Sequence, residues 1–416
     1  MHSRTASHTA SLLVFSIVLV ASTLAAAQAG QLDPTFGPGG IVTTDFGNGE
    51  HAGNSATANA VILQPDGKIV VVGGAPGSND GFPAAAVARY NTDGSLDTSF
   101  GTAGIAIAQG VPPLNSVALQ SDGKIVASAS GQLEVLVARF NSNGSLDSSF
   151  ATAGIFTSSF PLFTATGPSR VAIERDGKIL LTEGVMLLLS SNGTLDTSFG
   201  VAGEAVTVGD FTPALSLLSD AKILAGLFFA TGFADGGLVA RYNPNGSLDT
   251  SFGVNGQMPT IGSANALLLL NTGEFVVGGN LTSSISGPTT GFSLSRYLGV
   301  GFADPKFGTR GGVVTPVPNY SNLATSGLGA QSTGDLVILG TASNNQQLPV
   351  FALARYTPTG QLDSTFGTAG IAITSFGSDT VVANGLAIQT DDKIVTVGSY
   401  SDGFDTGYKL ARYLGH

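Results

Sequence analysis

The chain has no cysteine and no tryptophan among its 416 residues, and only four histidines. Without cysteine there is no disulfide framework, no thiolate metal ligand and no cysteine nucleophile. Beyond residue 29 the only histidines are His51 and His416, too few for a histidine-based zinc site or a Ser-His-Asp triad. We therefore expect no metal, no cofactor and no catalytic residue of these classes, and stability that comes from packing alone.

Positive charge is also scarce. Lys and Arg number 17 against 28 Asp and Glu, which gives a net charge of −11, and charged residues make up only 11% of the chain. Most of the Lys and Arg occupy two recurring motif positions, so few remain to build the basic stripe that nucleic acid requires. We expect no nucleic-acid partner.

One long apolar run is present, at residues 12–24, between Arg4 and the small residues 25–29. Its roughly 13 residues fall short of the ~20 that a spanning helix needs. The pattern is typical of a secretory signal cleaved after Ala27 or Ala29, with a membrane anchor as the rival interpretation. We predict a signal peptide at residues 1–29, a single domain at 30–416 without a membrane span, and a bacterial protein exported to the periplasm, cell surface or medium.

Glycine and short apolar runs are plentiful, with 58 Gly and 43% apolar residues. The stretch Asn91–Gly101 contains the motif LDTSFG, which recurs in seven exact or looser copies. The motif phenylalanines lie 49 to 64 residues apart, at Phe36, Phe100, Phe150, Phe199, Phe252, Phe307 and Phe366. A second signature, Asp66-Gly67-Lys68, also has seven exact or looser copies and alternates with the first.

Between the motifs lie runs of four to seven residues rich in Val, Ile, Leu and Ala, such as 60–64, 68–73, 85–91 and 104–108, which predict strands a, b, c and d. Four short strands in each of seven repeats predict an all-β, seven-bladed β-propeller of four-stranded antiparallel blades. The last repeat stops after three strands, and the mature chain begins with a surplus strand at residues 40–44. We predict that this strand completes the last blade beside residues 408–414 and closes the ring.

These repeated residues, GSLDTSFG, then AVILQPDGKIVVVGG, then ARYN, resemble the delta-60 repeat family of exported bacterial proteins over nearly the whole mature chain. The resemblance implies a propeller scaffold. It implies no catalytic or binding residue, because the family pattern describes scaffold positions. Two copies depart from the pattern, Met186–Leu189 and Phe302–Gly308, and we expect irregular blades there.

The repeats also place an Arg eight residues before the motif Asp, as in Arg89 and Asp97. The constant spacing predicts one repeated ion pair, with a ring of anion-binding arginines as the functional alternative. In the third repeat Leu188 replaces the Arg, so we expect Asp196 to use backbone donors or water. The turn from Asn91 to Asp97 resembles the start of a calcium loop but lacks its downstream acidic ligand, which favours a plain turn.

The loops that join strand b to c, and d to the next a, vary among the repeats and should share one face of the ring. A rigid scaffold with divergent loops on one face is typical of recognition. The candidate ligand-binding residues are the aromatic and acidic side chains of these loops, which we expect to be exposed: Asp80, Phe82, Phe160, Phe163, Phe228, Phe229, Phe233, Asp235, Tyr400, Asp402, Phe404 and Asp405.

We therefore predict a monomeric binding module for an extracellular glycan, peptide or envelope protein, and the sequence favours a protein without enzymatic activity. Two alternatives stay open. One is a polysaccharide lyase or hydrolase that uses paired carboxylates at the propeller axis, and the other is a purely structural surface protein.

Overall fold

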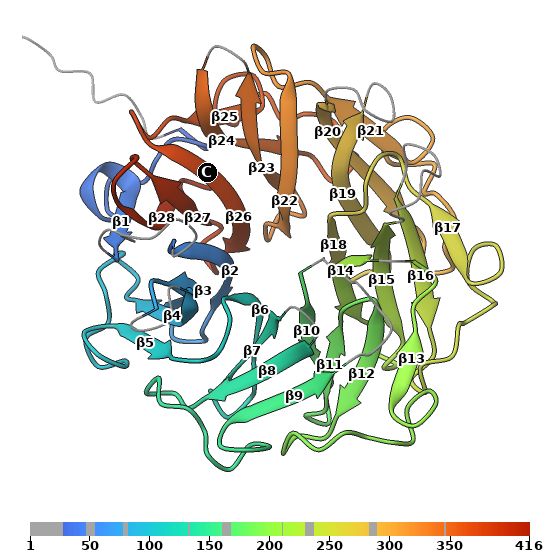
Figure 1. Ribbon diagram of the computed structural model, residues 1–416. Helices are drawn as coiled ribbons and strands as arrows, with labels where there is room; N and C mark the ends of the chain where they lie inside the picture. Colours follow the sequence, from blue (N-terminus) through green and yellow to red (C-terminus); the bar gives the residue numbers. More distant parts are fainter. Residues whose placement is uncertain are drawn as a thin grey trace, which may run out of the picture.

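The structure is a computed structural model that describes residues 28–46, 55–77, 82–131, 134–159, 168–209, 211–228, 237–282, 289–344 and 347–416. Within these ranges the chain forms seven antiparallel sheets of four strands each, set around a central axis (Figure 1). The predicted all-β, seven-bladed propeller is therefore confirmed. Across the same ranges the one helical element is the 3-10 turn η1 (Pro38–Gly40), and no helix is long and apolar enough to cross a membrane.

Each blade runs from an innermost strand a to an outermost strand d (Figure 1). Blade 1 consists of β2 (Thr57–Leu63), β3 (Ile69–Ala75), β4 (Ala84–Tyr90) and β5 (Ile105–Ala108). Blade 2 consists of β6 (Leu114–Leu119), β7 (Ile125–Ser130), β8 (Glu134–Phe140) and β9 (Ile155–Ser159). Blade 3 consists of β10 (Arg170–Ile173), β11 (Ile179–Thr182), β12 (Val185–Leu189) and β13 (Glu204–Val206). Blade 4 consists of β14 (Phe211–Leu217), β15 (Ile223–Phe228), β16 (Leu238–Tyr242) and β17 (Gln257–Pro259).

The remaining blades follow the same order. Blade 5 consists of β18 (Ala266–Leu269), β19 (Phe275–Thr282), β20 (Thr289–Tyr297) and β21 (Gly312–Thr315). Blade 6 consists of β22 (Asn322–Ala330), β23 (Leu336–Asn344), β24 (Gln347–Tyr356) and β25 (Ile371–Thr374). Blade 7 consists of β26 (Thr380–Ile388), β27 (Ile394–Ser401), β28 (Thr406–Tyr413) and the N-terminal strand β1 (Ile41–Asp45).

The ring closes between the two ends of the chain. Strand β1 pairs antiparallel with β28, in a register that runs from Ile41 opposite Ala411 to Asp45 opposite Gly407. This is the predicted pairing of residues 40–44 with 408–414. It gives blade 7 its outer strand and joins the two chain ends in one sheet.

The Asp-Gly-Lys signature forms the turn between strands a and b. In blade 1, Gly67 has a φ of +83° and its N–H donates to the Gln64 carbonyl at 2.9 Å, while the Lys68 N–H donates to Asp66 Oδ1 at 3.2 Å. Glycine adopts this left-handed conformation without steric cost, and the Asp side chain satisfies a turn amide. The repeated signature is therefore turn chemistry.

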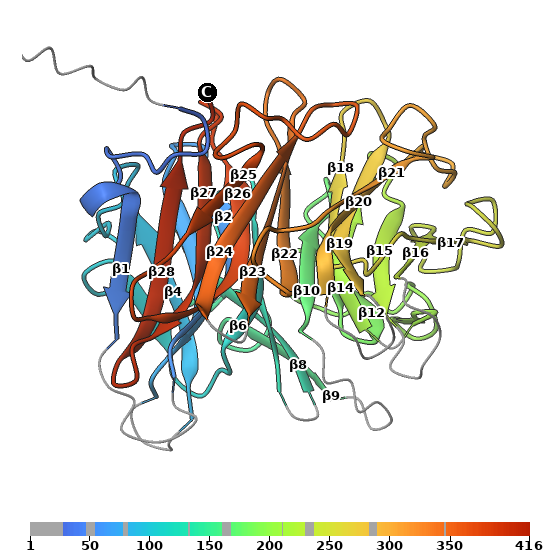
Figure 2. The same cartoon turned by 90° about the horizontal axis from the view of Figure 1, so that it is seen from above.

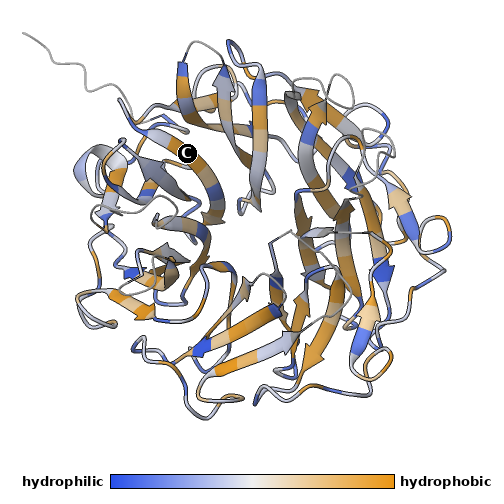
Figure 3. Ribbon diagram, viewed as in Figure 1, coloured by the Kyte–Doolittle hydropathy of each residue, from blue (hydrophilic) through white to orange (hydrophobic). Residues whose placement is uncertain are grey.

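The core lies between the blades. In the described residues the buried apolar side chains form seven clusters, one at each interface between neighbouring blades. Successive residues of a strand face opposite sides, so Val70 and Val72 pack toward blade 2, while Ile69 and Val71 pack toward blade 7. Figure 3 shows the apolar residues concentrated in the strands of the blades.

The connections divide between two faces of the ring. The a–b and c–d turns share one face with the C-terminus, at the top of Figure 2, and the b–c and d–a connections lie on the opposite face. We call these the turn face and the loop face. The turn face carries the repeated motifs, and the loop face carries the segments that differ between blades.

Candidate functional site

The repeated arginine joins every blade except blade 3 to the next one on the turn face. Arg89 Nε donates to Asp97 Oδ2 at 2.8 Å, and its Nη1 donates to the Ser142 carbonyl of blade 2 at 2.6 Å. Its guanidinium also lies 4.6 Å from the centre of the Phe100 ring. The same ion pair, ring contact and carbonyl bond recur at Arg139, Arg241, Arg296, Arg355 and Arg412.

The predicted Arg–Asp pair is confirmed, and its partners argue against an anion-binding ring. Each guanidinium is already shared among a carboxylate, an aromatic face and a carbonyl of the following blade. The copy at Phe302–Gly308 is regular here, because Arg296 Nε donates to Asp304 Oδ2 at 2.8 Å. We call the ion pair, ring contact and carbonyl hydrogen bond of each repeated arginine the clamp. In the repeat at Phe302–Gly308, where we expected an irregularity, the clamp is regular.

The tyrosine that follows the arginine holds the preceding blade. Tyr90 Oη lies 2.6 Å from Thr44 Oγ1 of blade 7, and Tyr413 Oη lies 2.7 Å from Thr374 Oγ1 of blade 6. Adjacent residues of a strand face opposite sides of the sheet, so an Arg-Tyr pair reaches both neighbours at once. In the blades that carry this Arg-Tyr pair, strand c therefore contacts both neighbouring blades.

In blade 3, where Leu188 replaces the arginine, the motif Asp196 has a lysine partner. Lys178 Nζ donates to Asp196 Oδ2 at 3.0 Å, and Ser198 Oγ donates to Asp196 Oδ1 at 2.5 Å. These hydrogen bonds, from Ser198 and then Lys178, lower the pKa of Asp196 to about 2. The expected backbone donor is present, because the Ser198 N–H donates to Asp196 Oδ1 at 3.1 Å. The lysine partner was not predicted, although the lysine of the a–b turn reaches the motif carboxylate in every blade that has both, as with Lys68 and Asp97 at 3.0 Å.

The calcium-like turn uses its own donors. Asp93 Oδ1 accepts hydrogen bonds from the Ser95 N–H at 2.9 Å and from Ser95 Oγ at 2.7 Å. Asn91 presents its amide Nδ2 to Ser95 Oγ at 3.0 Å. These contacts are those of an Asx-type turn, so the plain-turn interpretation accounts for the motif.

A cleft on the loop face brings together the variable segments of blades 1 and 2. Its volume is about 400 Å³, and its apolar lining includes Phe82, Pro83, Val111, Pro112 and Pro113. Phe82 has 69% of its surface exposed, whereas Val111 is buried beneath the cleft. The Ala85 N–H donates to the Val111 carbonyl at 2.7 Å and ties the two sides together. A mainly apolar hollow with an exposed ring is therefore present on the face where the sequence predicted recognition.

One end of the cleft is polar. Ser130, which lines the cleft with Gly131, accepts hydrogen bonds at Oγ from Asn115 Nδ2 at 2.9 Å and from the Ser169 N–H at 3.0 Å. The Ser130 hydroxyl proton is then available to the carboxyl of Glu183, with which it is hydrogen-bonded. Burial raises the pKa of Glu183 to about 7 despite that bond. Its Oε2 is buried without a hydrogen-bond partner among the described residues.

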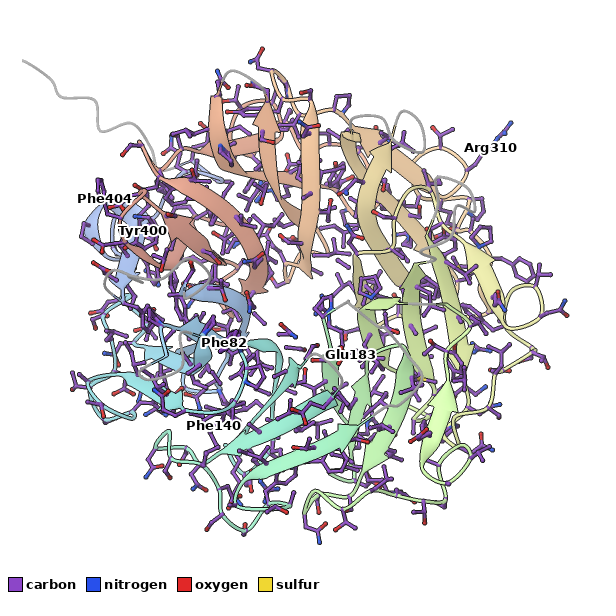
Figure 4. The ribbon with its side chains drawn as sticks, viewed as in Figure 1. Phe82, Phe140, Glu183, Arg310, Tyr400 and Phe404 are labelled. Atoms are coloured by element: carbon purple, nitrogen blue, oxygen red, sulfur yellow. The ribbon has the colours of Figure 1, made fainter. Side chains whose placement is uncertain are left out.

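Figure 4 shows how these residues lie: Phe82 and Glu183 are nearer the middle of the ring than Phe404, which stands on the outer rim of blade 7. Glu183 belongs to the b–c turn of blade 3, between β11 and β12. Sequence reasoning missed Glu183, Ser130 and Asn115. The one signal in the sequence that could have indicated Glu183 is its position as a charged residue in a short b–c connection between two apolar strands.

The predicted residues of blade 7 do not form one surface. Tyr400 is only 6% exposed and packs beneath Lys409, whose Nζ lies 4.5 Å from the ring centre, so the expectation of an exposed Tyr400 was wrong. Asp402 Oδ1 accepts the N–H groups of Phe404 and Asp405, each at 2.8 Å, and therefore shapes the β27–β28 turn. Phe404 is 85% exposed at the tip of that turn.

Of the remaining predicted residues, Phe228 is placed by its backbone, which ends β15 and pairs with Phe211 of β14. The others lie outside the described residues: Asp80, Phe160, Phe163, Phe229, Phe233 and Asp235.

The innermost strands carry a polar collar that the sequence analysis also overlooked. A β-bulge interrupts strand a in most blades, and a bulge side chain reaches the next blade: Asn59 Nδ2 donates to the Leu114 carbonyl at 2.8 Å, and Asn384 Nδ2 donates to the Ala58 carbonyl at 2.7 Å. The equivalent positions around the axis are Asn59, Asn115, Ser169, Pro213, Asn265, Ser326 and Asn384. None of these seven described positions contributes a carboxyl group.

Two larger hollows open on the turn face. One of about 560 Å³ is lined by the a–b turns of blades 3 to 5, with Glu174 and Asp220 among them, and one of about 790 Å³ by those of blades 7 to 2. Both are lined by the repeated turns that we predicted to be scaffold. Burial raises the pKa of Glu174, with Asp176 acting in the same direction.

Comparisons with known proteins concern the fold. A family model described as a domain of unknown function (DUF5122) beta-propeller matches residues 64–100, 120–150, 220–252 and 331–366. Each matched segment runs from the a–b turn to the motif phenylalanine of one blade. No curated protein matches the chain.

Solved structures resemble the chain at low sequence identity. Drosophila Semaphorin 2a is 8% identical with a TM-score of 0.50, covering 94% of this chain and 76% of its own. A Lactobacillus plantarum protein is 13% identical with a TM-score of 0.46, and the match covers 80% of this chain and 91% of that protein. Chaetomium thermophilum Sqt1 bound to the N-terminus of ribosomal protein L10 is 12% identical with a TM-score of 0.46, and the match covers 86% of this chain and 97% of Sqt1. At such identities the likeness concerns the fold alone. The seven-bladed ring and the four matched segments together identify this chain as a β-propeller repeat protein.

Proposed function

We propose that this chain is an exported propeller of the delta-60 repeat type that binds a peptide segment of an extracellular or envelope protein in the cleft between blades 1 and 2. The observation that carries the proposal is the exposed Phe82 ring over a hollow lined by three prolines. Prolines have little conformational freedom to lose, so such a surface is largely preorganised for a ligand.

The lining favours a peptide over a glycan. The apolar groups extend along most of the cleft, and polar side chains are confined to Gln109 and Ser130. A sugar ring requires hydrogen bonds around its whole edge, whereas an apolar peptide side chain requires them only for its backbone. A volume of about 400 Å³ accommodates one or two such side chains. Phe82 would contact the ligand side chain, and Gln109 and the Ser130 end would receive its backbone.

Charge narrows the class of peptide. The protein has a net charge of −11, and the carboxyl groups of Glu183, behind the polar end of the cleft, and of Glu134, beside Gly131, are both acidic. Electrostatic attraction therefore favours a neutral or cationic peptide and disfavours polyanions. No comparable observation supports the lyase or hydrolase alternative, since the described collar positions around the axis supply no carboxyl pair.

A binding screen tests the proposal. Residues 28–416 and two single variants, Phe82→Ala and Phe404→Ala, would be applied to a peptide array and to a glycan array. Phe404 is the matched control because it is also an exposed phenylalanine on the loop face but lies on the outer rim. We expect the wild type and Phe404→Ala to bind peptides with apolar residues, and Phe82→Ala to lose about tenfold or more in affinity.

Two results would count against the proposal. If Phe82→Ala binds the same peptides as tightly as the wild type, the cleft is not the binding surface. If only glycans bind, the surface assignment is kept and the ligand class is wrong.

A further inference from the structure

We propose that blade 3 binds a guanidinium group carried by a ligand, at the place on the turn face where the six other blades hold the guanidinium of their own repeated arginine. The site lies on the opposite face of the ring from the Phe82 cleft (Figure 2), and the inference does not depend on the ligand proposed for that cleft. The group that is recognised belongs either to an arginine in a protein segment or to a small guanidinium compound.

Blade 3 keeps the polar acceptors of the clamp without its arginine. In blade 2, Arg139 donates through Nε to Asp147 and through Nη1 to a carbonyl of the following blade, that of Ser191. The equivalent acceptors for blade 3 are Asp196 and the carbonyl of Pro244. No donor to the Pro244 carbonyl is present in the part of the chain that the structure describes. The Asp196 side chain is 20% exposed, against 8% for Asp147 beside its arginine. The other blades therefore show what this set of acceptors holds.

A further carboxylate stands at the end of strand a in blade 3. The equivalent residues of blades 2 and 6 are glutamines whose Oε1 accepts from the arginine of the same blade, as Gln120 does from Arg139 Nη1 at 3.4 Å. In blade 3 the residue is Glu174, and its Oε1 is buried without a hydrogen-bond partner among the described residues. Glutamine oxygens are also unpartnered at this position in blades 1 and 7, but an unpaired buried carboxylate costs more than an unpaired amide. Blade 3 thus gains an acceptor where it has lost the donor.

The site holds more negative charge than its own cation neutralises. The hydrogen bond to Asp196 raises the pKa of Lys178, and the charges of Asp196, Asp176 and Glu174 act in the same direction. Arg175 is exposed and forms no ion pair within the described ranges. A guanidinium presents five donors in a planar fork, so it can serve two carboxylates and a carbonyl at once, which a second ammonium group cannot. The unmet acceptors therefore favour a guanidinium.

A ligand can reach the site from the turn face. Glu174 is half-buried and lines the hollow of about 560 Å³ between the a–b turns of blades 3 to 5. Leu218 and Leu270 line the same hollow and would contact an apolar stem that carries the guanidinium. Phe199 is 1% exposed and packs in one apolar cluster with Leu188, so the ring contact of the other clamps is closed to a ligand. The guanidinium would therefore be held by hydrogen bonds and charge.

The test titrates the purified protein with a tripeptide that has a central arginine and blocked ends. Binding would be followed by ligand-detected NMR and by the shift in melting temperature. Matched tripeptides carry lysine or citrulline in place of arginine, and we expect both to bind about tenfold or more weakly. Methylguanidine identifies the source of the group. Equal binding of methylguanidine supports a small guanidinium compound, and tighter binding of the tripeptide supports a protein segment.

Three variants test the place of binding. Leu188→Arg restores the missing arginine within the chain, and we expect it to lose binding of the arginine tripeptide. Glu174→Gln removes one carboxylate at nearly unchanged size and should weaken binding about tenfold. The matched control is Asp122→Asn, an exposed turn carboxylate of blade 2 beside a filled clamp, which should bind as the wild type does. Glu174→Gln keeps the inference falsifiable if Leu188→Arg does not fold.

Three results would overturn the inference. They are no binding of the arginine tripeptide by the wild type, equal affinity for the arginine and lysine tripeptides, and unchanged affinity in a folded Leu188→Arg or in Glu174→Gln. Binding at the Phe82 cleft is measured with other probes, so each proposal can fail without the other.

Discussion

Arg412 Nε donates to Asp33 Oδ2 at 2.9 Å, so the last arginine of the chain pairs with an aspartate 379 positions before it. The same guanidinium lies 4.6 Å from the centre of the Phe36 ring and donates to the Thr92 carbonyl of blade 1. This is the clamp found in blades 1, 2, 4, 5 and 6, assembled here from the two ends of the chain. The ring is therefore closed by the same chemistry that joins consecutive blades, in addition to the β1–β28 pairing.

Loss of the closing carboxylate should destabilise the whole ring. The change Asp33→Ala leaves Arg412 buried without its carboxylate and removes the 3.4 Å contact with Lys393. We expect the free energy of unfolding in urea to fall by about 3 kcal/mol. The control is Asp66→Ala, whose exposed carboxylate pairs with Lys68 at 3.7 Å and should cost at most about 0.5 kcal/mol. Equal losses in the two variants would show that the closing clamp contributes nothing special.

The turn lysine should matter most in blade 3. Lys178→Ala removes the only cationic partner found for Asp196 among the described residues, whereas Lys124→Ala leaves Asp147 paired with Arg139 at 2.8 Å. We expect a loss of about 1 kcal/mol for Lys178→Ala and a few tenths for Lys124→Ala, because Asp147 keeps its arginine partner whereas Asp196 loses its cationic partner, and a partly exposed ion pair contributes at most about 1 kcal/mol. Denaturant titrations would measure both. A larger loss for Lys124→Ala would contradict the substitution of lysine for arginine in blade 3.

The carboxyl of Glu183 should make stability depend on pH. Burial raises its pKa to about 7 in the folded protein, above the ordinary value of 4.5. Between these values the folded state holds a proton that the unfolded state has lost. The stability that this group contributes is therefore complete below pH 4.5 and is lost as the pH rises through 7. Glu183→Gln lacks this loss.

The measurement compares wild type with Glu183→Gln at pH 4.5 and pH 8. On going from pH 4.5 to pH 8, we expect the free energy of unfolding of Glu183→Gln to rise relative to that of the wild type by on the order of 1 kcal/mol. The expected difference is small because the Glu183 side chain is only partly buried. The exposed Glu204 on β13 provides the control variant, Glu204→Gln. A stability difference between wild type and Glu183→Gln that is the same at both pH values would show that the carboxyl does not hold its proton.

Local repetition made the fold predictable. The Asp66–Lys68 turn, the Arg89–Asp97 spacing and the surplus strand at residues 40–44 are short-range patterns, and each has a direct structural counterpart. The site was less predictable. Tyr400 and Phe404 are alike in the sequence of one loop, yet one packs beneath Lys409 and the other points to solvent.

Contacts between blades explain most of what the sequence could not show. The cleft at Phe82 depends on the d–a segment around Val111 lying beside the b–c segment, and Ser130 meets Glu183 only because blades 2 and 3 are adjacent. Such pairings follow from the packing of unlike loops, for which no repeated spacing exists. The Lys178–Asp196 pair could have been inferred, since Lys68 and Asp97 stand in the same relation in blade 1.

The most direct test of the proposed peptide cleft uses the absence of cysteine. A single Gln109→Cys in the cleft, or Val201→Cys on the rim of blade 3, can be labelled with an environment-sensitive fluorophore, because the chain offers no competing thiol. The labelled proteins would be titrated with an apolar, neutral or cationic peptide that the array screen returns. We predict a saturable change at position 109 that Phe82→Ala abolishes, and none at position 201. Equal responses at both positions, or a response that survives Phe82→Ala, would contradict the assignment of the cleft as the binding surface.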